Sequence, residues 1–171
     1  MNGFEKIDVK KLPGNIFALF DTNWALITAG EENRWNTMTI SWGQAGWLWG
    51  RPVVTAYVRK SRYTLGFTEA RGCFTISFFD QGSCRAQLGV LGSKSGRDMD
   101  KMHESGLTPI MIEGEHAFAE ARAVLLCRKV YADWIDPGKF LDPSVFDKSY
   151  ADREDVHRMY VAEVLSAYVR K

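Results

Sequence analysis

Short β-prone runs, each bounded by turn residues, follow one another along most of this chain. The clearest are residues 24–28, 37–42, 53–58, 73–79, 124–131 and 160–169, and the shorter run at 16–20 is included with them. Within residues 73–79, Phe74, Ile76 and Phe78 alternate with Thr75 and Ser77, as expected for a strand with one buried face. Runs of this length separated by turns predict an antiparallel meander.

Three short helices are expected between the strands. They would begin at Thr64, Ser83 and Asp98, which are residues that cap helices, and the third would end at Gly106. None is long enough to form a helical bundle. Many short strands with a few short helices predict a mainly β fold, an antiparallel barrel that is closed or nearly closed. No GxGxxG turn is present, which disfavours a doubly wound dinucleotide-binding sheet.

The length and net charge of the chain limit the number of domains and the kinds of partner to be expected. The 171 residues suffice for one compact domain, so we expect a single unit over 1–171. The 22 Lys and Arg nearly balance the 21 Asp and Glu, so neither nucleic acid nor an anionic membrane is an expected partner. No run is long and apolar enough to cross a bilayer and no leader precedes the first strand, which predicts a cytoplasmic location.

Cysteine and histidine give little support to metal or nucleophile chemistry. Cys73, Cys84 and Cys127 show no CxxC spacing and sit among apolar neighbours, so buried reduced thiols are expected. The three histidines, His103, His116 and His157, are far apart, so no metal site is expected. His157, just before the last predicted strand, is a possible ligand-facing residue, although a lone histidine is more often structural.

The segment most informative for function is residues 36–64. The hydroxyl-rich strand at 36–42 and the tryptophans that follow it offer aromatic faces and small hydrogen-bonding groups for a planar ring. Residues 59–64, Arg-Lys-Ser-Arg-Tyr-Thr, lie between an apolar strand and a helix start, and offer guanidinium groups, hydroxyls and backbone N–H groups for a phosphate. A flat heterocycle carrying a phosphate is the ligand to consider first, and flavin mononucleotide (FMN) fits that description.

Each of these elements also has an ordinary structural interpretation. Residues 59–64 on their own would be a solvated basic turn, and residues 36–42 an edge strand whose hydroxyls meet water. Trp42, Trp47 and Trp49 are equally suited to packing in a core or an interface. A Gly/Ser-rich loop at 92–101 has the composition of a flexible lid over an anion, or of a mobile surface loop, and does not match a Walker P-loop.

Taken in order and spacing, these segments resemble the flavin reductase-like FMN-binding proteins, the split β-barrel group that includes flavoredoxin. The resemblance covers most of the chain and is carried by residues 36–42, 59–64, 74–77, 95–101 with 106–109, and 160–164. It implies a homodimeric split barrel of the antiparallel Greek-key type that holds FMN near the subunit interface. It also implies a set of FMN-binding positions, which are Asn36, Thr37, Met38, Thr39, Ser41 and Trp42 at the ring, Arg59, Ser61, Arg62, Tyr63 and Thr64 at the phosphate, and Ser95 and Arg97 from the lid.

Three functions remain open at this stage. The first is a flavin reductase that passes electrons from NADH or NADPH through FMN. The second is a flavoredoxin-like electron carrier reduced by a redox protein partner, and the third is a module that binds FMN or haem without redox chemistry. Reductases of the resembling group often carry Gly-Asp-His before the last strand, where this chain has Glu154-Asp155-Val156-His157. In the two redox functions, hydride or electrons would be delivered to the flavin, and the protein would supply position and electrostatics rather than an acid or base of its own.

Overall fold

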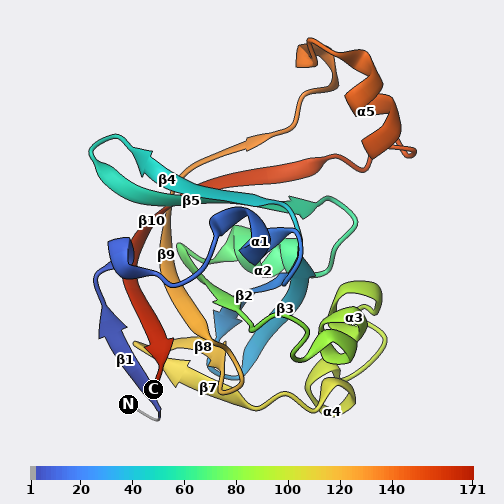
Figure 1. Cartoon of the computed structure of the whole chain (residues 1–171). Coiled ribbons are helices and arrows are strands. Elements are labelled where there is room, and N and C mark those ends of the chain that lie inside the picture. The colour runs from blue at the N-terminus through green and yellow to red at the C-terminus, as the bar shows by residue number, and fades with distance from the viewer. Residues whose placement is uncertain (1–2) are drawn as a thin grey trace.

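The computed structural model describes residues 3–171 and consists mainly of antiparallel strands (Figure 1). The strands are β1 (Phe4–Ile7), β2 (Ala25–Glu31), β3 (Arg34–Ile40), β4 (Gly43–Leu48), β5 (Arg51–Arg59), β6 (Cys73–Phe78), β7 (Pro109–Ile112), β8 (Glu115–Phe118), β9 (Ala123–Trp134) and β10 (His157–Arg170). The helices are α1 (Ile16–Phe20), α2 (Thr64–Ala70), α3 (Arg85–Ser93), α4 (Lys101–Ser105) and α5 (Pro143–Ser149), with 3-10 turns at Val9–Lys11 and Pro137–Lys139.

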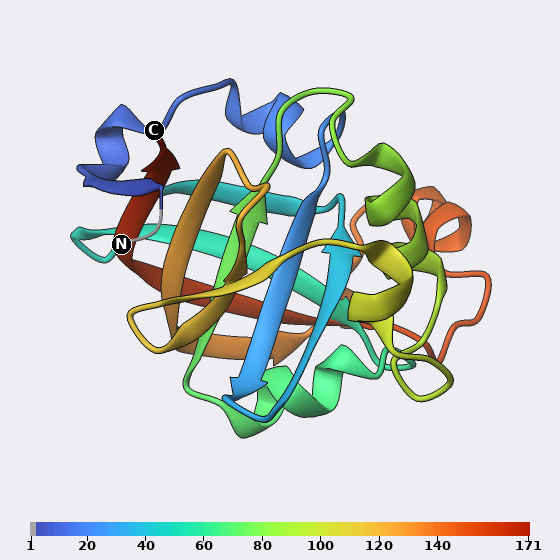
Figure 2. The ribbon, with the colours of Figure 1, turned by 90° about the horizontal axis from the view of Figure 1, so that it is seen from below.

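One eight-stranded sheet organises the molecule, and it does not close. Its order is β3-β2-β6-β9-β10-β5-β4, with β1 also paired to β10, while β7 and β8 form a separate hairpin. Figure 2 shows the strands crossing one another as the sheet curls. In the described part of the chain no ladder joins β3 to β5, so the barrel is split along this line. The predicted mainly β, antiparallel fold is confirmed, and the split form rather than the closed form is the one present.

The sheet ends at β3 on one side and at β4 on the other, and β4 covers only part of β5. β4 pairs with β5 as far as Ala56, so Tyr57 and Arg59 have β10 on one side and no strand on the other within residues 3–171. β3 likewise pairs with β2 alone. The chain passes from one side of the opening to the other through Ser41 and Trp42.

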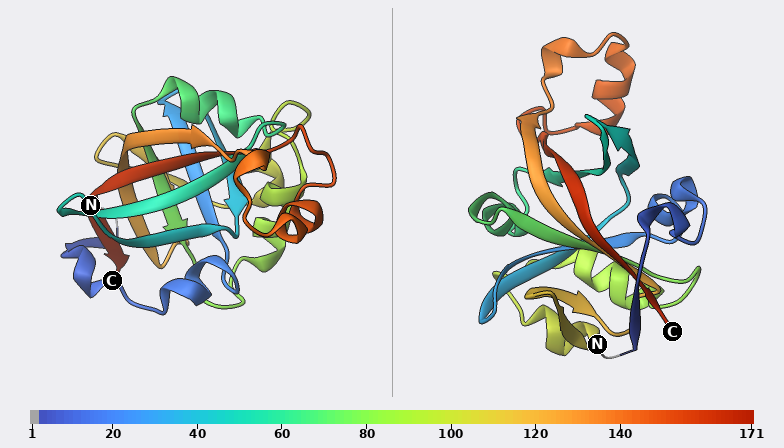
Figure 3. Two further views of the ribbon diagram at one scale, coloured as in Figure 1. Left: turned by 90° about the horizontal axis from the view of Figure 1, so that it is seen from above. Right: turned by 90° about the vertical axis from the view of Figure 1, so that its left-hand side faces the viewer.

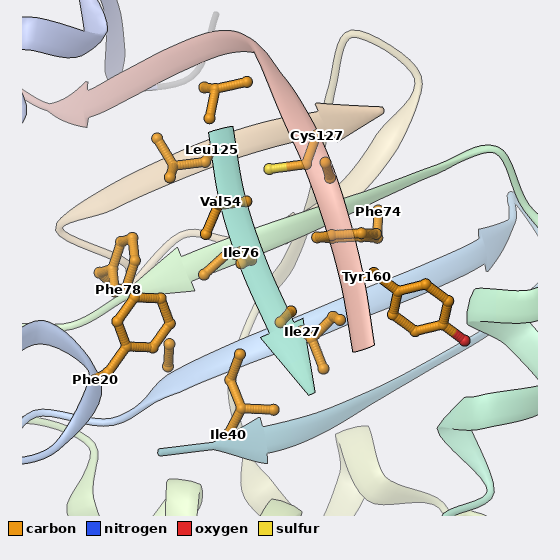
Figure 4. Close-up of a cluster of buried hydrophobic side chains, with 14 of the residues drawn as sticks. Phe20, Ile27, Ile40, Val54, Phe74, Ile76, Phe78, Leu125, Cys127 and Tyr160 are labelled. Carbon is orange, nitrogen blue, oxygen red and sulfur yellow. The ribbon is translucent and has the colours of Figure 1, made fainter. Parts of the chain in front are cut away.

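Apolar side chains fill both faces of the central strands. Figure 4 shows the cluster inside the curled sheet, where Phe74, Ile76 and Phe78 of β6 meet Ile27 and Tyr160. A second cluster forms where Leu26, Phe79, Leu88, Leu91 and Phe118 pack together under α3 and the β7–β8 hairpin. Burying each such side chain contributes about 1.5 to 3 kcal/mol before entropy is subtracted.

β6 is therefore covered on two sides, and the expectation of one buried face was wrong. Thr75 and Ser77 are as fully buried as the phenylalanines beside them. The Thr75 hydroxyl donates to the carbonyl of His116 in β8, at 2.6 Å. The β7–β8 hairpin covers the face of β6 that carries Thr75 and Ser77, which the alternation of polar and apolar residues had predicted to face solvent.

Residues 16–20 form helix α1, and their assignment to a strand was wrong. The Asn15 side chain caps the helix by accepting from the backbone N–H of Phe17, at 2.9 Å. The ring of Phe20 packs against β4 at Gly43, where a Cβ atom would come within 2.3 Å of the ring. A run of five apolar residues fits the periodicity of a helix or of a strand, and here the Asn15 cap stabilises the helix.

The three expected helices are present with different caps. Thr64 is the first residue of α2 rather than its cap, and Cys84 rather than Ser83 precedes α3. Asp100 rather than Asp98 caps α4, which ends at Gly106 in the left-handed conformation, as expected. β1, β4, β7, β8 and α5 were not predicted.

Residues 135–156, which we call the excursion, project from the sheet between β9 and β10 (Figure 3). Phe140, Phe146 and Tyr150 give this segment a small aromatic core, with the Phe146 and Tyr150 rings stacked at 5.1 Å. The Arg59 guanidinium ties its base to β5 by donating to the carbonyls of Ser149 at 2.9 Å and Asp155 at 3.3 Å.

The remaining features of residues 3–171 agree in part with expectation. All three cysteines are free; Cys127 is fully buried, whereas Cys73 and Cys84 are half-buried, so the burial prediction holds for Cys127 alone. The described residues contain no helix that is long and apolar enough to span a membrane. They also contain no cluster of His, Cys, Asp and Glu of the kind that holds a metal ion.

Candidate functional site

Two adjoining hollows lie at the split. The first, which we call the aromatic hollow, has a volume of about 210 Å³ and is lined by Met38, Thr39, Ile40, Ser41, Trp42, Tyr57, Arg59, Arg62 and His157. The second, the basic hollow, has a volume of about 120 Å³ and is lined by Met38, Ser61, Arg62, Tyr63, Thr64, Ser93, Lys94, Ser95, Arg97 and Lys101. Met38 and Arg62 line both hollows, so the two lie side by side, and we call them together the groove.

The walls of the aromatic hollow come from β3, the unpaired end of β5 and the start of β10. Trp42 is 44% exposed, and its ring centroid lies 4.8 Å from that of His157. The Tyr57 ring centroid lies 6.4 Å from that of His157, and the two rings are nearly perpendicular. Aromatic faces on a partly open rim are suited to a planar ligand.

His157 is a neutral side chain in this setting. Its Nδ1 atom is hydrogen-bonded to the hydroxyl of Tyr150 in the excursion, at 2.9 Å. Burial, and then the positive charge of Arg59, lower the pKa of His157 to about 4. At neutral pH the imidazole therefore offers polarity without charge to the hollow.

The side chains that line the basic hollow gather positive charge. Arg62, Lys94, Arg97 and Lys101 line it, and no carboxylate does within the described residues. Among residues 3–171 the guanidinium of Arg62 has no hydrogen-bond or ion-pair partner, and only the backbone N–H and carbonyl of this residue are bonded. Four cations around so small a volume favour an anion that carries more than one charge.

The loop expected to act as a lid lies against the turn at 59–64. Arg97 donates to the carbonyl of Ser61 at 3.4 Å, and its guanidinium stacks over the Tyr63 ring at 4.8 Å. The approach depends on Gly96, because a Cβ atom there would come within 2.5 Å of the Asn36 amide oxygen and 3.2 Å of the Tyr63 ring. Ser95 and Arg97 are thus brought beside the residues of the turn.

Several predicted site residues already bond to other parts of the protein. The Asn36 amide donates to the Thr64 hydroxyl at 2.8 Å, and Asn36 lines neither hollow. Thr37 is fully buried, where its hydroxyl pairs with that of Thr28, and it also lines neither hollow. Thr39 lines the aromatic hollow but donates to the carbonyl of Leu88 at 2.6 Å.

Ser61 is also engaged. Its backbone N–H and its hydroxyl both donate to the carboxylate of Asp155, each at 2.8 Å. Asp155 lies 3.9 Å from the Arg59 guanidinium as well. Arg59 and Ser61 therefore anchor the base of the excursion, while Arg62 and Arg97 remain available to the groove.

Lys101 was not singled out from the sequence. Lys101 is 7% exposed, and its ammonium donates to the carbonyls of Thr37 and Leu91, each at 2.9 Å. Burial, and then the charge of Arg62, lower the pKa of Lys101 to about 8. In a sequence, an Asp-Lys pair in a short helix is usually interpreted as part of a solvent-exposed helix face. Only the position of Lys101 after the Gly/Ser-rich loop could have indicated that it belongs to the site.

The family of the chain follows from comparison with known proteins. Residues 17–171 match the model of the flavin reductase like domain, and the chain belongs to that family. No curated protein matches the sequence significantly.

Solved structures with the same fold include several flavoproteins. An FMN-binding domain of a flavin reductases-like enzyme from Shewanella baltica has a TM-score of 0.70 and 20% identity, over 99% of this chain and 78% of that chain. Flavoredoxin from Methanosarcina acetivorans has a TM-score of 0.65 and 21% identity, over 98% and 76%. An NADH:FAD oxidoreductase from Streptomyces globisporus has a TM-score of 0.63 and 20% identity, over 91% and 80%.

Proposed function

We propose that this protein binds FMN in the groove at the split and passes electrons through it as an NAD(P)H-dependent flavin reductase. The observation that carries the proposal is the adjacency of the two hollows. An aromatic hollow suited to a planar ring lies beside a basic hollow suited to a phosphate, and Met38 and Arg62 line both. Family membership supports the same ligand class.

The side chains present fit FMN in charge and shape. Arg62, Arg97 and Lys101, with the hydroxyls of Thr64 and Ser95, would hold the phosphate, because they supply donors and positive charge with no carboxylate among the lining residues. Met38, Ser41, Trp42 and His157 would border the ring. FMN would supply the electron chemistry, and these side chains would bind it, orient it and limit its contact with water.

Flavin loading tests the binding part of the proposal. The purified protein is incubated with FMN, desalted and examined by visible absorption. We expect retained flavin absorbance at one FMN per chain. A spectrum without flavin, together with no change in FMN fluorescence on titration, would contradict FMN binding.

Anaerobic addition of NADPH and then NADH to the loaded protein tests the reductase part. Bleaching of the flavin band by either nucleotide is the expected result. Retained flavin that neither nucleotide bleaches would contradict the reductase assignment.

A flavoredoxin-like carrier is the second candidate. The observation in its favour lies at the start of β10, where the neutral His157 is bonded to Tyr150 and the sequence reads Glu154-Asp155-Val156-His157 rather than Gly-Asp-His. Bleaching by a reduced ferredoxin-type donor but not by nicotinamide would favour the carrier.

We further propose that the protein is a homodimer. Apolar side chains are exposed near the excursion, among them Phe17 at 82% and Leu141 at 103% of full exposure. A groove of about 980 Å³, lined mostly by apolar residues of α1, β4 and the excursion, opens beside the aromatic hollow. A second copy of the chain would cover this apolar groove and the exposed side chains beside it.

A further inference from the structure

A tyrosine of the excursion is hydrogen-bonded to a histidine of the aromatic hollow. The Tyr150 hydroxyl lies 2.9 Å from Nδ1 of His157, and among residues 3–171 this hydroxyl forms no other hydrogen bond. Tyr150 directly follows α5, whereas His157 is the first residue of β10. Both side chains are buried, with 5% and 7% exposure. A segment outside the sheet therefore acts on a side chain that lines the groove.

The second ring nitrogen of His157 is the one available to a ligand. The imidazole lines the aromatic hollow, and its Nε2 atom has no hydrogen-bond partner among the described residues. The neighbouring Trp42 and Tyr57 rings contact it only as aromatic groups. Buried polar atoms are normally hydrogen-bonded. Nε2 is therefore the polar atom that a ring bound in this hollow would satisfy.

Both members of the pair are uncharged at neutral pH. Burial raises the pKa of Tyr150, so its hydroxyl keeps its hydrogen. Burial, and then the charge of Arg59, lower the pKa of His157 to about 4, although the Asp155 carboxylate acts in the opposite direction. Asp155 accepts from the backbone N–H and the hydroxyl of Ser61 rather than from either ring. The pair therefore shares one O–H and one N–H hydrogen.

One arrangement of these two hydrogens uses the contact fully. The Arg59 guanidinium, whose carbon lies 5.2 Å from the centroid of the Tyr150 ring, supplies donors and no acceptor. If Nδ1 of His157 carried the hydrogen, the Tyr150 O–H would have no acceptor among residues 3–171. When Tyr150 donates to Nδ1 instead, the hydrogen of the neutral imidazole lies on Nε2.

We propose that Tyr150 is a positioning residue that fixes the tautomer of His157, so that Nε2–H is a hydrogen-bond donor to the flavin ring and favours its reduced form. The inference rests on the proposed function, because it gives a role to the contact between the excursion and the ring site. Tyr150 lines neither the aromatic nor the basic hollow and acts only through His157.

The preference for reduced flavin follows from charge. Reduction adds two electrons to the ring and makes its nitrogen and oxygen atoms stronger acceptors. Hydrogen bonds become stronger when the acceptor carries negative charge. A fixed N–H donor therefore binds the reduced ring more tightly than the oxidised ring, whereas a lone pair at the same place would do the opposite. The contact thus raises the reduction potential of the bound flavin.

Redox titration of the FMN-loaded protein, against a dye of known potential, compares the wild type with Tyr150→Phe, His157→Asn and Tyr131→Phe. We expect Tyr150→Phe to lower the ratio of affinities for reduced and oxidised FMN by about threefold to tenfold, which is about 15 to 30 mV for a two-electron couple. His157→Asn should lower the ratio by about tenfold or more, because its amide is too short to place a donor at Nε2. Tyr131→Phe removes a hydroxyl that donates to Asp133 at 2.8 Å, outside both hollows, and should leave the ratio unchanged.

An unchanged ratio in Tyr150→Phe would overturn the proposal, even if both forms of FMN bind more weakly, because a purely structural role predicts equal losses. His157→Gln has a longer amide that brings an N–H near the position of Nε2, so it should recover part of the ratio lost in His157→Asn. No recovery in His157→Gln would contradict the donor role.

The tautomer is measured from the ring ¹⁵N chemical shifts of His157 in the flavin-free protein at neutral pH. We expect the hydrogen on Nε2 alone in the wild type and a mixture of both tautomers in Tyr150→Phe. A hydrogen on Nδ1 in the wild type, or a single Nε2–H tautomer in both proteins, would overturn the proposal. If Tyr150→Phe does not fold, the wild-type shifts and the ratio in His157→Asn decide: Nε2–H with a lowered ratio supports the proposal, and Nδ1–H or an unchanged ratio removes it.

The outcomes also separate this inference from the proposed function. FMN that binds with the same potential in the wild type and in Tyr150→Phe keeps the flavin site and removes the role of Tyr150. If FMN does not bind, the proposed function fails together with the redox part of the inference. The ring ¹⁵N shifts then still decide whether Tyr150 fixes the tautomer of His157.

Discussion

The side chains that line the groove differ in whether their polar groups already form hydrogen bonds within the protein. Arg62 has a guanidinium without a partner among residues 3–171, whereas Ser61 gives both of its donors to Asp155. The two residues are neighbours in the sequence and look equivalent as phosphate ligands. The structure separates them, since an unpaired cation gains a partner when an anion binds and a paired hydroxyl first has to lose one.

Replacement of Arg62 by Ala is expected to weaken FMN binding by about 1.5 to 3 kcal/mol, the range for a hydrogen bond to a charged group. Riboflavin affinity should change far less, because riboflavin carries no phosphate. Fluorescence titration measures both. Lys60→Ala, at an exposed position of the same turn, is the control. Unchanged FMN affinity in Arg62→Ala would remove this residue from the site.

The stability of the protein is expected to depend on His157 in mild acid. The folded-state pKa, about 4, lies below the unfolded value of 6.5, so the stabilisation is present above pH 6.5 and is lost as the pH falls toward 4. The loss corresponds to about 3 kcal/mol. Urea unfolding at pH 7 and pH 4.5 would show a smaller pH effect in His157→Asn than in the wild type. Equal pH effects would mean that His157 is not buried in its neutral form.

At the scale of elements, the lid is held by close packing rather than by a network of bonds. Gly96 brings the loop between α3 and α4 against Asn36 of β3 and against Tyr63. Arg97 then stacks over Tyr63 and reaches the carbonyl of Ser61. The position of Arg97 in the groove therefore depends on a residue that contacts no ligand.

Gly96→Ala is expected to displace the lid and weaken FMN binding, because the added methyl would lie 2.5 Å from the Asn36 amide oxygen. Overpacking of this kind costs about 1 to 3 kcal/mol. Gly89→Ala is the matched control, since it lies within α3 with no atom within 4 Å of the added Cβ. That variant should be more stable by roughly 0.5 to 1 kcal/mol and bind FMN normally. Thermal melts and FMN titrations of both variants check the pair, and normal FMN binding by Gly96→Ala would contradict the role of the lid.

Much of the fold could be predicted because strand alternation and turn residues are local signals. The strands at 37–42, 53–58 and 124–131 lie within a few residues of β3, β5 and β9. Helix α1 was not predicted because its five apolar residues fit both the helical and the strand periodicity. β7 and β8 were not predicted because strands of four residues are too short to show a clear alternation of polar and apolar side chains. Most residue types that line the groove could also be predicted from the sequence. The bonds of Ser61 to Asp155 and the burial of Lys101 could not, because they depend on contacts between residues distant in sequence.

At the scale of the whole molecule, the split in the barrel is what makes a site. β4 leaves β5 at Ala56, and β3 has no partner on its outer side within residues 3–171. The opening receives side chains from β3, the turn after β5, the lid, α4 and the start of β10. A closed barrel of the same strands would bury these residues against each other.

The exposed apolar surface predicts a dimer in solution. Light scattering after gel filtration should give twice the 19.4 kDa chain mass. Phe17→Glu should lower that mass, since Phe17 is 82% exposed and lines the large apolar groove. Met111→Glu is the control, at an exposed apolar position of β7 far from the excursion (Figure 1). A monomeric wild type would contradict the proposed homodimer.

A crystal structure of the protein grown with FMN would show where the ligand binds. We expect the phosphate among Arg62, Arg97 and Lys101, and the ring beside Trp42 and His157 at the split. Density for FMN elsewhere on the molecule, or a phosphate placed away from the basic hollow, would contradict it.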